Sequence, residues 1–374
     1  MELKKIISEF DKQTNWQKSQ CEKIKSHSLP VIIFGAGIMA KSVTEQLNIY
    51  GVEVAGYAES EKYYKPGKTY LGKPVFKYSE LHNRPQDYVF VLGTADSANP
   101  TGGGGKAAHA FINDGKINGY FLNTTPNENI TLEYVLQNID NFSQTLNWLE
   151  DDFSKKTMIA YLKQHINDDP SLSKEIFCSE QYFNELTLFA LNEHCIFFDC
   201  GAYDGDTIRN FLKYSNGKYK KIFAAEADSA NFDGLKNFVE KNNYDNIKIF
   251  NCGVWNEKGS ISFDGGREIS SAISNDGNGE TTISVDTIDN LLSSEPVTFI
   301  KMDIEGSELN ALKGAQESIK KHKPTLAICV YHKAEDLITI PQFIKSLNQD
   351  YKFYLRKHMI YFINSELVLY CLPR

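Results

Sequence analysis

The sequence has 374 residues, of which 41% are hydrophobic and 24% charged, and its formal net charge is −8. A chain of this length suggests two domains or one large domain, with enough apolar material for a buried core. The negative charge repels polyanions, and lysine runs such as residues 218–221 are better explained as solvated surface. We therefore expect no nucleic-acid partner.

Cysteine usage and hydropathy indicate the cellular compartment. The seven cysteines are irregularly spaced and include no C-x-x-C pair, which predicts neither a disulfide framework nor a zinc site. No apolar run approaches the roughly 20 residues that cross a bilayer, and residues 1–20 lack the apolar stretch of a secretory signal. We expect a cytoplasmic protein, and the sequence leaves a homo-oligomer open.

The first part of the chain predicts a small α/β unit over about residues 25–125. Residues 31–34 form a continuous apolar run that leads through Gly35-Ala-Gly37 into a helical pattern, as in a buried parallel strand followed by a helix. The composition of residues 97–105 predicts a flexible loop. Two further strands are expected, at residues 52–57 and 88–92.

A helical stretch separates this unit from the rest of the chain. From about residue 132 to residue 191 the apolar residues recur at helical spacing, which predicts a helical connector or an N-terminal extension of the next domain. We place the boundary near Asp151, so that residues 1–150 and 151–374 form the two domains.

The second part of the chain predicts a doubly wound parallel sheet, because apolar strand segments alternate with helical patterns. An insertion at residues 259–289 is rich in small polar residues, and its alternating piece at residues 282–285 indicates added β structure. Five core strands are expected at residues 195–198, 221–225, 247–250, 297–300 and 325–330, and two terminal strands at residues 351–354 and 367–371.

The strongest motif is the turn after the first of these strands, residues 199–207. Gly201 and Gly205 allow the backbone to approach a ligand closely, and the helix that follows points its N-terminus toward the ligand-binding edge of such a sheet. The acids of the turn would repel a pyrophosphate but suit a cationic sulfonium ligand. The alternative is an ordinary strand-to-helix turn with capping aspartates. The three acids are Asp199, Asp204 and Asp206.

Two more acids follow strands of the same sheet. Glu226 ends the second strand, where a carboxylate can accept both ribose hydroxyls of an adenosine, although a solvated strand-end acid is the alternative. Asp303 follows the fourth strand and would lie next to the first turn in a sheet ordered 3-2-1-4-5. Lys301, Glu305 and Glu308 flank it, which indicates a charged pocket wall.

A histidine follows the fifth strand. His332 could serve as a base, although a lone histidine is more often structural. Asp303 is the second candidate for the catalytic group. A version of the chemistry that uses a metal, with Asp303 and Glu305 as oxygen ligands, is the weaker hypothesis, and no metal is assigned.

Several segments together resemble the FkbM-type methyltransferases. The resemblance covers roughly residues 151–374 and depends on these motifs occurring in this order. It is carried by residues 198–207, 300–308, 313–315 and 330–333, with residues 181–183 as their lead-in.

This resemblance implies a class I methyltransferase fold, S-adenosylmethionine as methyl donor, and a hydroxyl acceptor on a sugar or natural product. By position, the glycine turn would line the methionine part, Glu226 the ribose, and Asn251 and Cys252 the adenine, with Asp303 facing the methyl group. The expected cofactor-binding residues are Asp199, Gly201, Ala202, Asp204, Gly205, Glu226, Asn251, Cys252 and Asp303.

The N-terminal unit is similar to Rossmann-like domains of bacterial sugar-modifying enzymes. Residues 35–40 fit the pattern G-x-G-x-x-A, and Glu59 stands where such domains carry the ribose-binding acid. A nucleotide or nucleotide-sugar site is one interpretation. A docking platform that kept the fold without a ligand is the other.

The sequence thus predicts a methyltransferase that modifies a hydroxyl of a small molecule, nucleotide-sugar or glycan. Two alternatives remain open. One is a nicotinamide-dependent oxidoreductase that uses the first glycine turn. The other is a non-catalytic scaffold that kept two nucleotide-binding folds.

Overall fold

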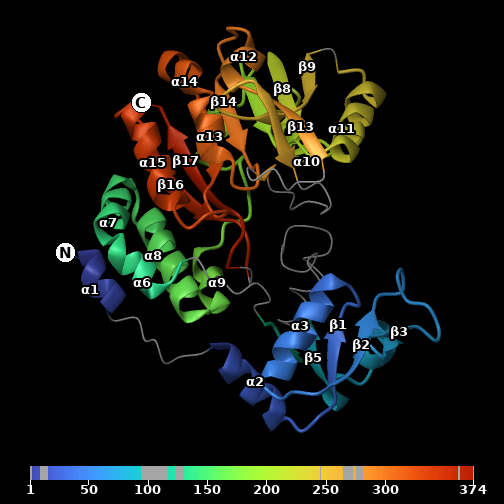
Figure 1. Ribbon diagram of the computed structural model, residues 1–374. Coiled ribbons are helices and arrows are strands. Elements are labelled where there is room, and N and C mark those ends of the chain that lie inside the picture. The colour runs from blue at the N-terminus through green and yellow to red at the C-terminus, as the bar shows by residue number, and fades with distance from the viewer. Residues whose placement is uncertain are drawn as a thin grey trace. The chain divides into compact units, whose positions relative to one another are not determined.

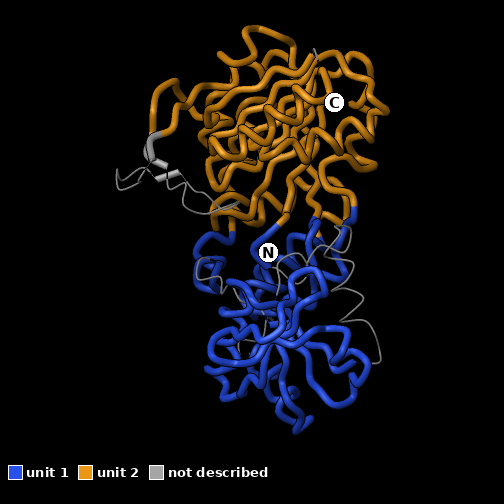
Figure 2. Tube along the Cα trace, turned by 90° about the vertical axis from the view of Figure 1, so that its right-hand side faces the viewer, with its two compact units in different colours: residues 1–139, 156–179, 357–365 blue, residues 140–155, 180–356, 366–374 orange. Residues whose placement is uncertain are grey.

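The computed structural model describes residues 2–8, 16–93, 117–122, 130–244, 246–263, 273–274, 281–360 and 363–373, and the loop predicted at residues 97–105 lies outside them. The chain forms two compact units, drawn in different colours in Figure 2. Unit 1 comprises residues 1–139, 156–179 and 357–365, and unit 2 comprises residues 140–155, 180–356 and 366–374.

Unit 1 contains a six-stranded sheet in the order β3-β4-β2-β1-β5-β6. β1 lies between β2 and β5 and is parallel to both, as expected of a strand buried on two faces. The short strand β3 pairs antiparallel with β4. The strands are β1 (Val31–Phe34), β2 (Val54–Glu59), β3 (Thr69–Tyr70), β4 (Lys73–Lys77), β5 (Val89–Leu92) and β6 (Asn118–Tyr120).

Helix α3 (Ile38–Ile49) follows β1, as the sequence predicts. It buries Ala40, Val43 and Leu47, which recur at helical spacing, and leaves the side chains at its two ends exposed. Among the described residues before residue 90, the other helices are α1 (Glu2–Ser8), α2 (Trp16–Ser26), α4 (Tyr78–His82) and the 3-10 turn η1 (Pro85–Asp87).

The connector is helical only in its first part. Its elements are α6 (Leu132–Gln137), α7 (Ile139–Trp148), α8 (Asp152–Asn167), η3 (Pro170–Leu172) and α9 (Ser173–Ile176). The prediction that helical structure continues to residue 191 is wrong. Bends and turns occupy residues 182–187, and only the 3-10 turn η4 (Leu188–Ala190) follows before residue 191. Tyr182 has a left-handed backbone with φ of 62°, and its carbonyl accepts a hydrogen bond from the Thr187 hydroxyl.

Unit 2 is built on a seven-stranded sheet in the order β16-β17-β15-β14-β7-β8-β9. The five strands from β9 to β15 are parallel in the predicted order 3-2-1-4-5, and β17 pairs antiparallel with β15. The strands are β7 (Ile196–Cys200), β8 (Lys221–Glu226), β9 (Ile247–Asn251), β14 (Phe299–Met302), β15 (Thr325–Cys329), β16 (Lys352–Lys357) and β17 (Leu367–Leu372).

Helices follow most of these strands. In Figure 1, α11 lies beside β9, whereas α13, α14 and α15 gather near β17. The sheet with its connecting helices confirms the predicted doubly wound architecture. The helices are α10 (Asp206–Tyr214), α11 (Ser229–Lys241), α12 (Ile288–Leu292), α13 (Glu308–Lys313), α14 (Gln316–His322) and α15 (Asp336–Leu347).

The insertion before β14 contains the predicted β structure. β13 (Thr281–Asp286) pairs antiparallel with β11 (Gly259–Phe263) and parallel with β10 (Gly253–Val254), and β12 (Ile273–Ser274) completes a four-stranded sheet. Residues 264–272 and 275–280 of this insertion lie outside the described ranges.

Aromatic side chains fill the core of unit 2. Phe197 of β7 stacks on Phe211 of α10 with ring centroids 4.7 Å apart, and Phe183 and Phe299 meet Phe197 edge to face. Each such pair stabilises the fold by about 0.5–1.5 kcal/mol beyond the area it buries. This core fixes β7 and α10, and therefore the turn between them.

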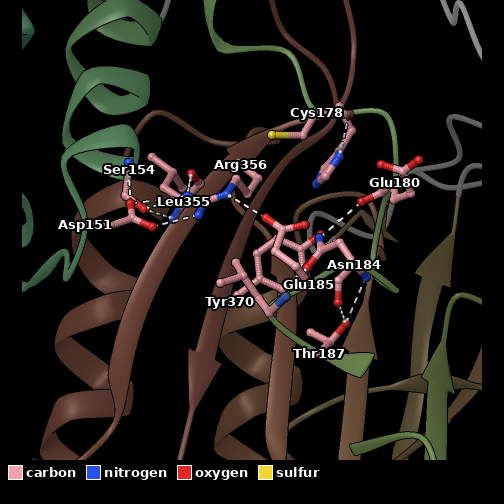
Figure 3. Close-up of polar contacts among 12 residues, drawn as sticks. Asp151, Ser154, Cys178, Glu180, Asn184, Glu185, Thr187, Leu355, Arg356 and Tyr370 are labelled. Carbon is pink, nitrogen blue, oxygen red and sulfur yellow. Dashed lines mark hydrogen bonds and ion pairs between the residues drawn. The ribbon is translucent and has the colours of Figure 1, made fainter. Parts of the chain in front are cut away.

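Arg356 organises a polar cluster at the end of β16, shown in Figure 3. Its guanidinium donates hydrogen bonds to both carboxylate oxygens of Asp151 and to the Ser154 hydroxyl, and that hydroxyl accepts a bond from the Leu355 amide. The side chain of Arg356 is buried, so this bidentate pairing ties the start of α8 to β16.

The two units interleave along the chain, unlike the single boundary predicted near Asp151. Leu149 forms a β-bridge with Phe353 in unit 2, and Phe177 forms one with Lys357 in unit 1. Such pairings over about 200 residues leave no local signal, so periodicity could not reveal them. Among the described residues, no helix has the length and apolar character needed to cross a membrane.

Candidate active site

A pocket of about 360 Å³ opens at the carboxyl ends of β7, β8 and β14 in unit 2. This volume lies within the range of ligand pockets, roughly 300–1,000 Å³. Six carboxylates and one lysine line it, so its field is strongly negative. These charged residues are Asp206, Glu226, Asp228, Lys301, Asp303, Glu305 and Glu366.

Gly201 brings the turn after β7 against the loop after β14. Its φ is 78°, and a Cβ atom at this position would lie 2.0 Å from the carbonyl oxygen of Asp303. Only glycine tolerates both the left-handed backbone and this approach. The amide of Gly201 donates to the carbonyl of Ala225, which fixes the turn to β8.

Glu226 ends β8 with its side chain directed into the pocket wall. One carboxylate oxygen accepts the amide of Tyr203 at 2.8 Å and the other accepts the amide of Asp228 at 2.9 Å. Burial raises the pKa of Glu226 above its ordinary value, although these two amides act in the opposite direction. Each oxygen keeps a further lone pair, so the carboxylate can still accept two ligand hydroxyls.

Asp303 lies at the other end of the pocket and accepts hydrogen bonds from two phenol hydroxyls. Tyr182 donates to Oδ2 at 2.9 Å and Tyr331 to Oδ1 at 3.1 Å. Burial acts to raise the pKa of Asp303, but Lys301, His332 and the two hydroxyls outweigh it and hold this pKa below its ordinary value. Asp303 is therefore an oriented anion at neutral pH.

The segment that carries Tyr182 is held by its own hydrogen bonds. The amide of Tyr182 donates to the Tyr370 hydroxyl, and the amide of Asn184 donates to the Thr187 hydroxyl. Figure 3 shows Tyr370 of β17 near Asn184 and Thr187. The adjacent Gln181 donates to the carboxylate of Glu366. These contacts place Tyr182 against Asp303.

His332 lies behind Asp303 and is not part of the pocket lining. Its Nδ1 is 2.9 Å from Oε1 of Glu308, and its Nε2 is 3.5 Å from Oδ1 of Asp303 and 3.6 Å from Oε2 of Glu305. Burial lowers the pKa of His332, but these carboxylates outweigh burial and raise it to about 10. Burial raises the pKa of Glu305 to about 7, and the nearby acids add to this shift.

Residues 199–353 match the family model of the methyltransferase FkbM domain. This segment carries the glycine turn, Glu226, Asp303 and His332. The chain contains an FkbM-type methyltransferase domain.

One solved structure shares the fold. The FkbM methyltransferase of Methylobacillus flagellatus KT is 24% identical with a TM-score of 0.65, over 94% of this chain and 92% of that one. A ribosomal RNA methylase from Streptococcus thermophilus is 15% identical with a TM-score of 0.34, over 51% of this chain and 92% of that one. No curated protein sequence matches the chain.

Four of the predicted cofactor residues line the pocket of the methyltransferase domain: Gly201, Glu226, Cys252 and Asp303. The others lie outside its lining. Ala202 is buried, and Asn251 is exposed and donates to the carbonyl of Glu226.

Two predicted acids of the turn have partners of their own. Asp199 is fully buried and forms an ion pair with Lys301 at 3.0 Å. Asp204 is half-exposed and forms an ion pair with Arg209 of α10. Both carboxylates therefore lie outside the pocket lining, whereas the sequence predicted that they bind the cofactor. Asp206 is the acid of this turn that lines the pocket.

Gly205 is needed for packing in the methyltransferase domain. Its φ is 91°, and a Cβ atom there would lie 2.7 Å from the ring of Phe238 in α11. The second glycine of the turn thus lets α10 and α11 approach each other, which a loop motif alone does not distinguish from ligand contact.

Sequence reasoning missed the two tyrosines that contact Asp303. Tyr331 lies two residues after the end of β15, so its place at the ligand-binding edge was a usable signal. Tyr182 lies in a turn before β7, and nothing in its spacing predicts that its hydroxyl reaches Asp303. Only its place in the family-like lead-in singled it out.

The glycine turn of unit 1 has neighbours within its own unit. The Tyr70 hydroxyl donates to the carbonyl of Gly37, and Lys68 donates to both carboxylate oxygens of Glu59. The acid predicted to bind a ribose is therefore already paired. A nucleotide site in this unit stays a prediction.

Proposed function

We propose that the protein transfers the methyl group of S-adenosylmethionine to a hydroxyl of a sugar, glycan or related small molecule. The observation that carries this proposal is the acidic pocket at the carboxyl ends of the parallel strands. A sulfonium cation is attracted to such a pocket, whereas the pyrophosphate of a nicotinamide dinucleotide is repelled. The pocket therefore favours a methyl donor over the oxidoreductase alternative.

The donor would extend between two ends of the pocket. Glu226 is held by two backbone amides with lone pairs to spare, which suits a ribose diol. Cys252, Gly253 and Val254 offer a less polar wall beyond it for the adenine. Asp206 and Asp303 lie toward the other end, where the amino group and the sulfonium carry positive charge.

Asp303 would position the acceptor. Tyr182 and Tyr331 orient its two oxygens, and these oxygens can also accept a hydrogen bond from the hydroxyl of a bound acceptor. The hydroxyl oxygen then attacks the methyl carbon, the carbon–sulfur bond breaks, and its electron pair stays on sulfur. The hydroxyl proton passes to the carboxylate. Alignment of this in-line displacement is the main contribution of the protein.

His332 would act as a positioning residue. Its Nε2 faces Oδ1 of Asp303 from behind the pocket wall, so it orients the carboxylate without touching the substrate. The carboxylates Asp303, Glu305 and Glu366 at this end disfavour acceptors that present a phosphate there. A neutral polyhydroxy acceptor fits the end better.

Isothermal titration calorimetry with S-adenosylmethionine, S-adenosylhomocysteine and NAD tests the proposal on the full chain. We expect both sulfur ligands to bind and NAD not to bind. Glu226→Ala should weaken donor binding at least about tenfold, because it removes a charge-assisted hydrogen-bond acceptor. Asp233→Ala is the matched control, since Asp233 is an exposed acid of α11 outside the pocket. A folded chain that binds neither sulfur ligand would overturn the proposal.

A further inference from the structure

A compact group of three ionisable side chains lies behind the acceptor end of the pocket. Asp303, Glu308 and His332 each offer one ligand atom, and these atoms all lie within 4.8 Å of one another. Ligands on one ion, each about 2.1 Å from it, are no more than about 4.2 Å apart. A small side-chain rotation therefore brings this group to coordination distance.

His332 is buried in this group without a hydrogen bond. Its side chain is 9% exposed, and neither ring nitrogen has a hydrogen-bond partner among the residues that the structure describes. Nδ1 lies 2.9 Å from Oε1 of Glu308, but the angles do not form a hydrogen bond. A buried imidazole in this state indicates that a further partner is required.

Glu308 has the same deficit. It is fully buried, its Oε1 accepts the amide of Ile304 at 3.0 Å, and its Oε2 has no hydrogen-bond partner in the described part of the chain. In the described ranges, His332 is the only basic side chain within ion-pair distance of Glu308. Glu308 shares this one partner, because Asp303 and Glu305 also lie within ion-pair distance of the same imidazole.

The local charge does not balance either. Asp303, Glu305 and Glu308 surround His332, and the buried Asp336 adds a fourth acid nearby. Lys301, two residues before Asp303 on β14, already pairs with Asp199 of β7. One imidazole therefore faces two buried acids, Glu308 and Asp336, and two partly exposed acids, Asp303 and Glu305.

We propose that Asp303, Glu308 and His332 bind a divalent cation, with the neutral imidazole of His332 as the nitrogen ligand after its extra proton leaves to solvent. Two carboxylates and one imidazole suit ions such as Mn²⁺ and Zn²⁺, which accept mixed oxygen and nitrogen ligands. The oxygens of Asp303 keep a lone pair beside each tyrosine hydroxyl, so the carboxylate can bind an ion while it stays on the pocket wall. The ion would lie next to the acceptor hydroxyl.

This site goes beyond the proposed function, because it does not depend on the identity of the methyl donor. It also differs from a site of Asp303 and Glu305 alone. Glu308 supplies the second carboxylate and His332 the nitrogen ligand, so the ion would be held behind the pocket wall.

The proposal can be tested without S-adenosylmethionine by titrating the metal-free full chain with Mn²⁺. The concentration of free Mn²⁺ is measured by electron paramagnetic resonance. We expect one site. Glu308→Gln and His332→Ala should each weaken Mn²⁺ binding at least tenfold, and the exposed controls Glu335→Gln and His194→Ala should bind as the original chain does. The proposal would be overturned if the original chain did not bind Mn²⁺, or if Glu308→Gln and His332→Ala bound it as tightly as the original chain does.

The unmodified chain provides a second test in case the buried variants do not fold. Anomalous diffraction from a crystal soaked in Mn²⁺ should give a peak between these three side chains. A peak elsewhere, or none, contradicts the site. Calorimetry with S-adenosylmethionine is a separate measurement, so failure of the metal site and failure of the proposed donor are distinguishable.

Discussion

The Nζ of Lys301 lies 3.0 Å from Oδ1 of Asp199, and both side chains are buried on adjacent strands of the unit 2 sheet. Lys301 also donates to the carbonyl of Gly201. Burial alone lowers the pKa of Lys301, but Asp199 and Asp303 outweigh it and raise this pKa above its ordinary value. Lys301 thus stabilises the glycine turn through its ion pair with Asp199 and its hydrogen bond to Gly201.

Removal of one partner of this pair should strongly destabilise the fold. We expect Lys301→Met or Asp199→Leu alone to lower the free energy of unfolding by about 3–5 kcal/mol, because each leaves an unpaired buried charge. The double variant should be more stable than either single one. Urea unfolding measures all three, and a double variant with the summed loss of the two singles would contradict this account.

Gly201→Ala tests the approach of the turn to Asp303. We expect a large loss of stability, because the new Cβ meets a backbone oxygen that cannot move aside. Gly217→Ala is the matched control, since its φ is 69° but no atom lies within 4 Å. Its free energy of unfolding should fall by only about 1–2 kcal/mol, which is the cost of a left-handed backbone for a residue with a Cβ atom. Equal losses in thermal unfolding would show that the contact with Asp303 contributes nothing.

Tyr182→Phe removes one of the two hydroxyls on Asp303. We expect kcat for methyl transfer to fall about tenfold, because a hydrogen bond to a charged group contributes about 1.5–3 kcal/mol. The KM for the donor should stay nearly unchanged. Tyr351→Phe is the control, since the Tyr351 hydroxyl donates to the carbonyl of Pro324 away from the pocket. If both variants have the original kcat, Tyr182 does not orient the reacting group.

The stability of unit 2 should depend on pH through Asp151. Burial acts to raise the pKa of Asp151, but the bonds from Arg356 and Ser154 hold it below its ordinary value of 3.8. A depressed folded pKa contributes stability that is present above the unfolded value and lost as the pH falls through the folded one. Asp151→Asn should therefore flatten the fall in unfolding free energy below about pH 5. The exposed Asp152→Asn should leave the profile unchanged.

Acceptor choice should follow the charge of the pocket. We expect a neutral glycoside to be methylated faster than the same sugar with a phosphate beside the reacting hydroxyl, because Glu305 and Glu366 repel the phosphate. Glu305→Gln should narrow this difference in kcat/KM. A preference for the phosphorylated sugar would contradict the proposed acceptor class.

The sequence predicted the parallel sheet and its strand order because buried strands and helices have strong local patterns. It also located Glu226 and Asp303, since acids that follow parallel strands meet at one edge of the sheet. Asp199 and Asp204 lie outside the pocket lining, and a turn motif does not show whether an acid points into the pocket, into the core or toward a neighbouring arginine. Tyr182 and Glu366 reach the site from segments whose approach depends on tertiary packing alone.

A crystal structure of the full chain with S-adenosylhomocysteine would show where the methyl donor binds. We expect the ribose hydroxyls on the carboxylate of Glu226, the adenine beside Cys252, and the sulfur directed toward Asp303. A ligand bound elsewhere, or one in this pocket with its ribose remote from Glu226, would contradict the assignment of the donor site.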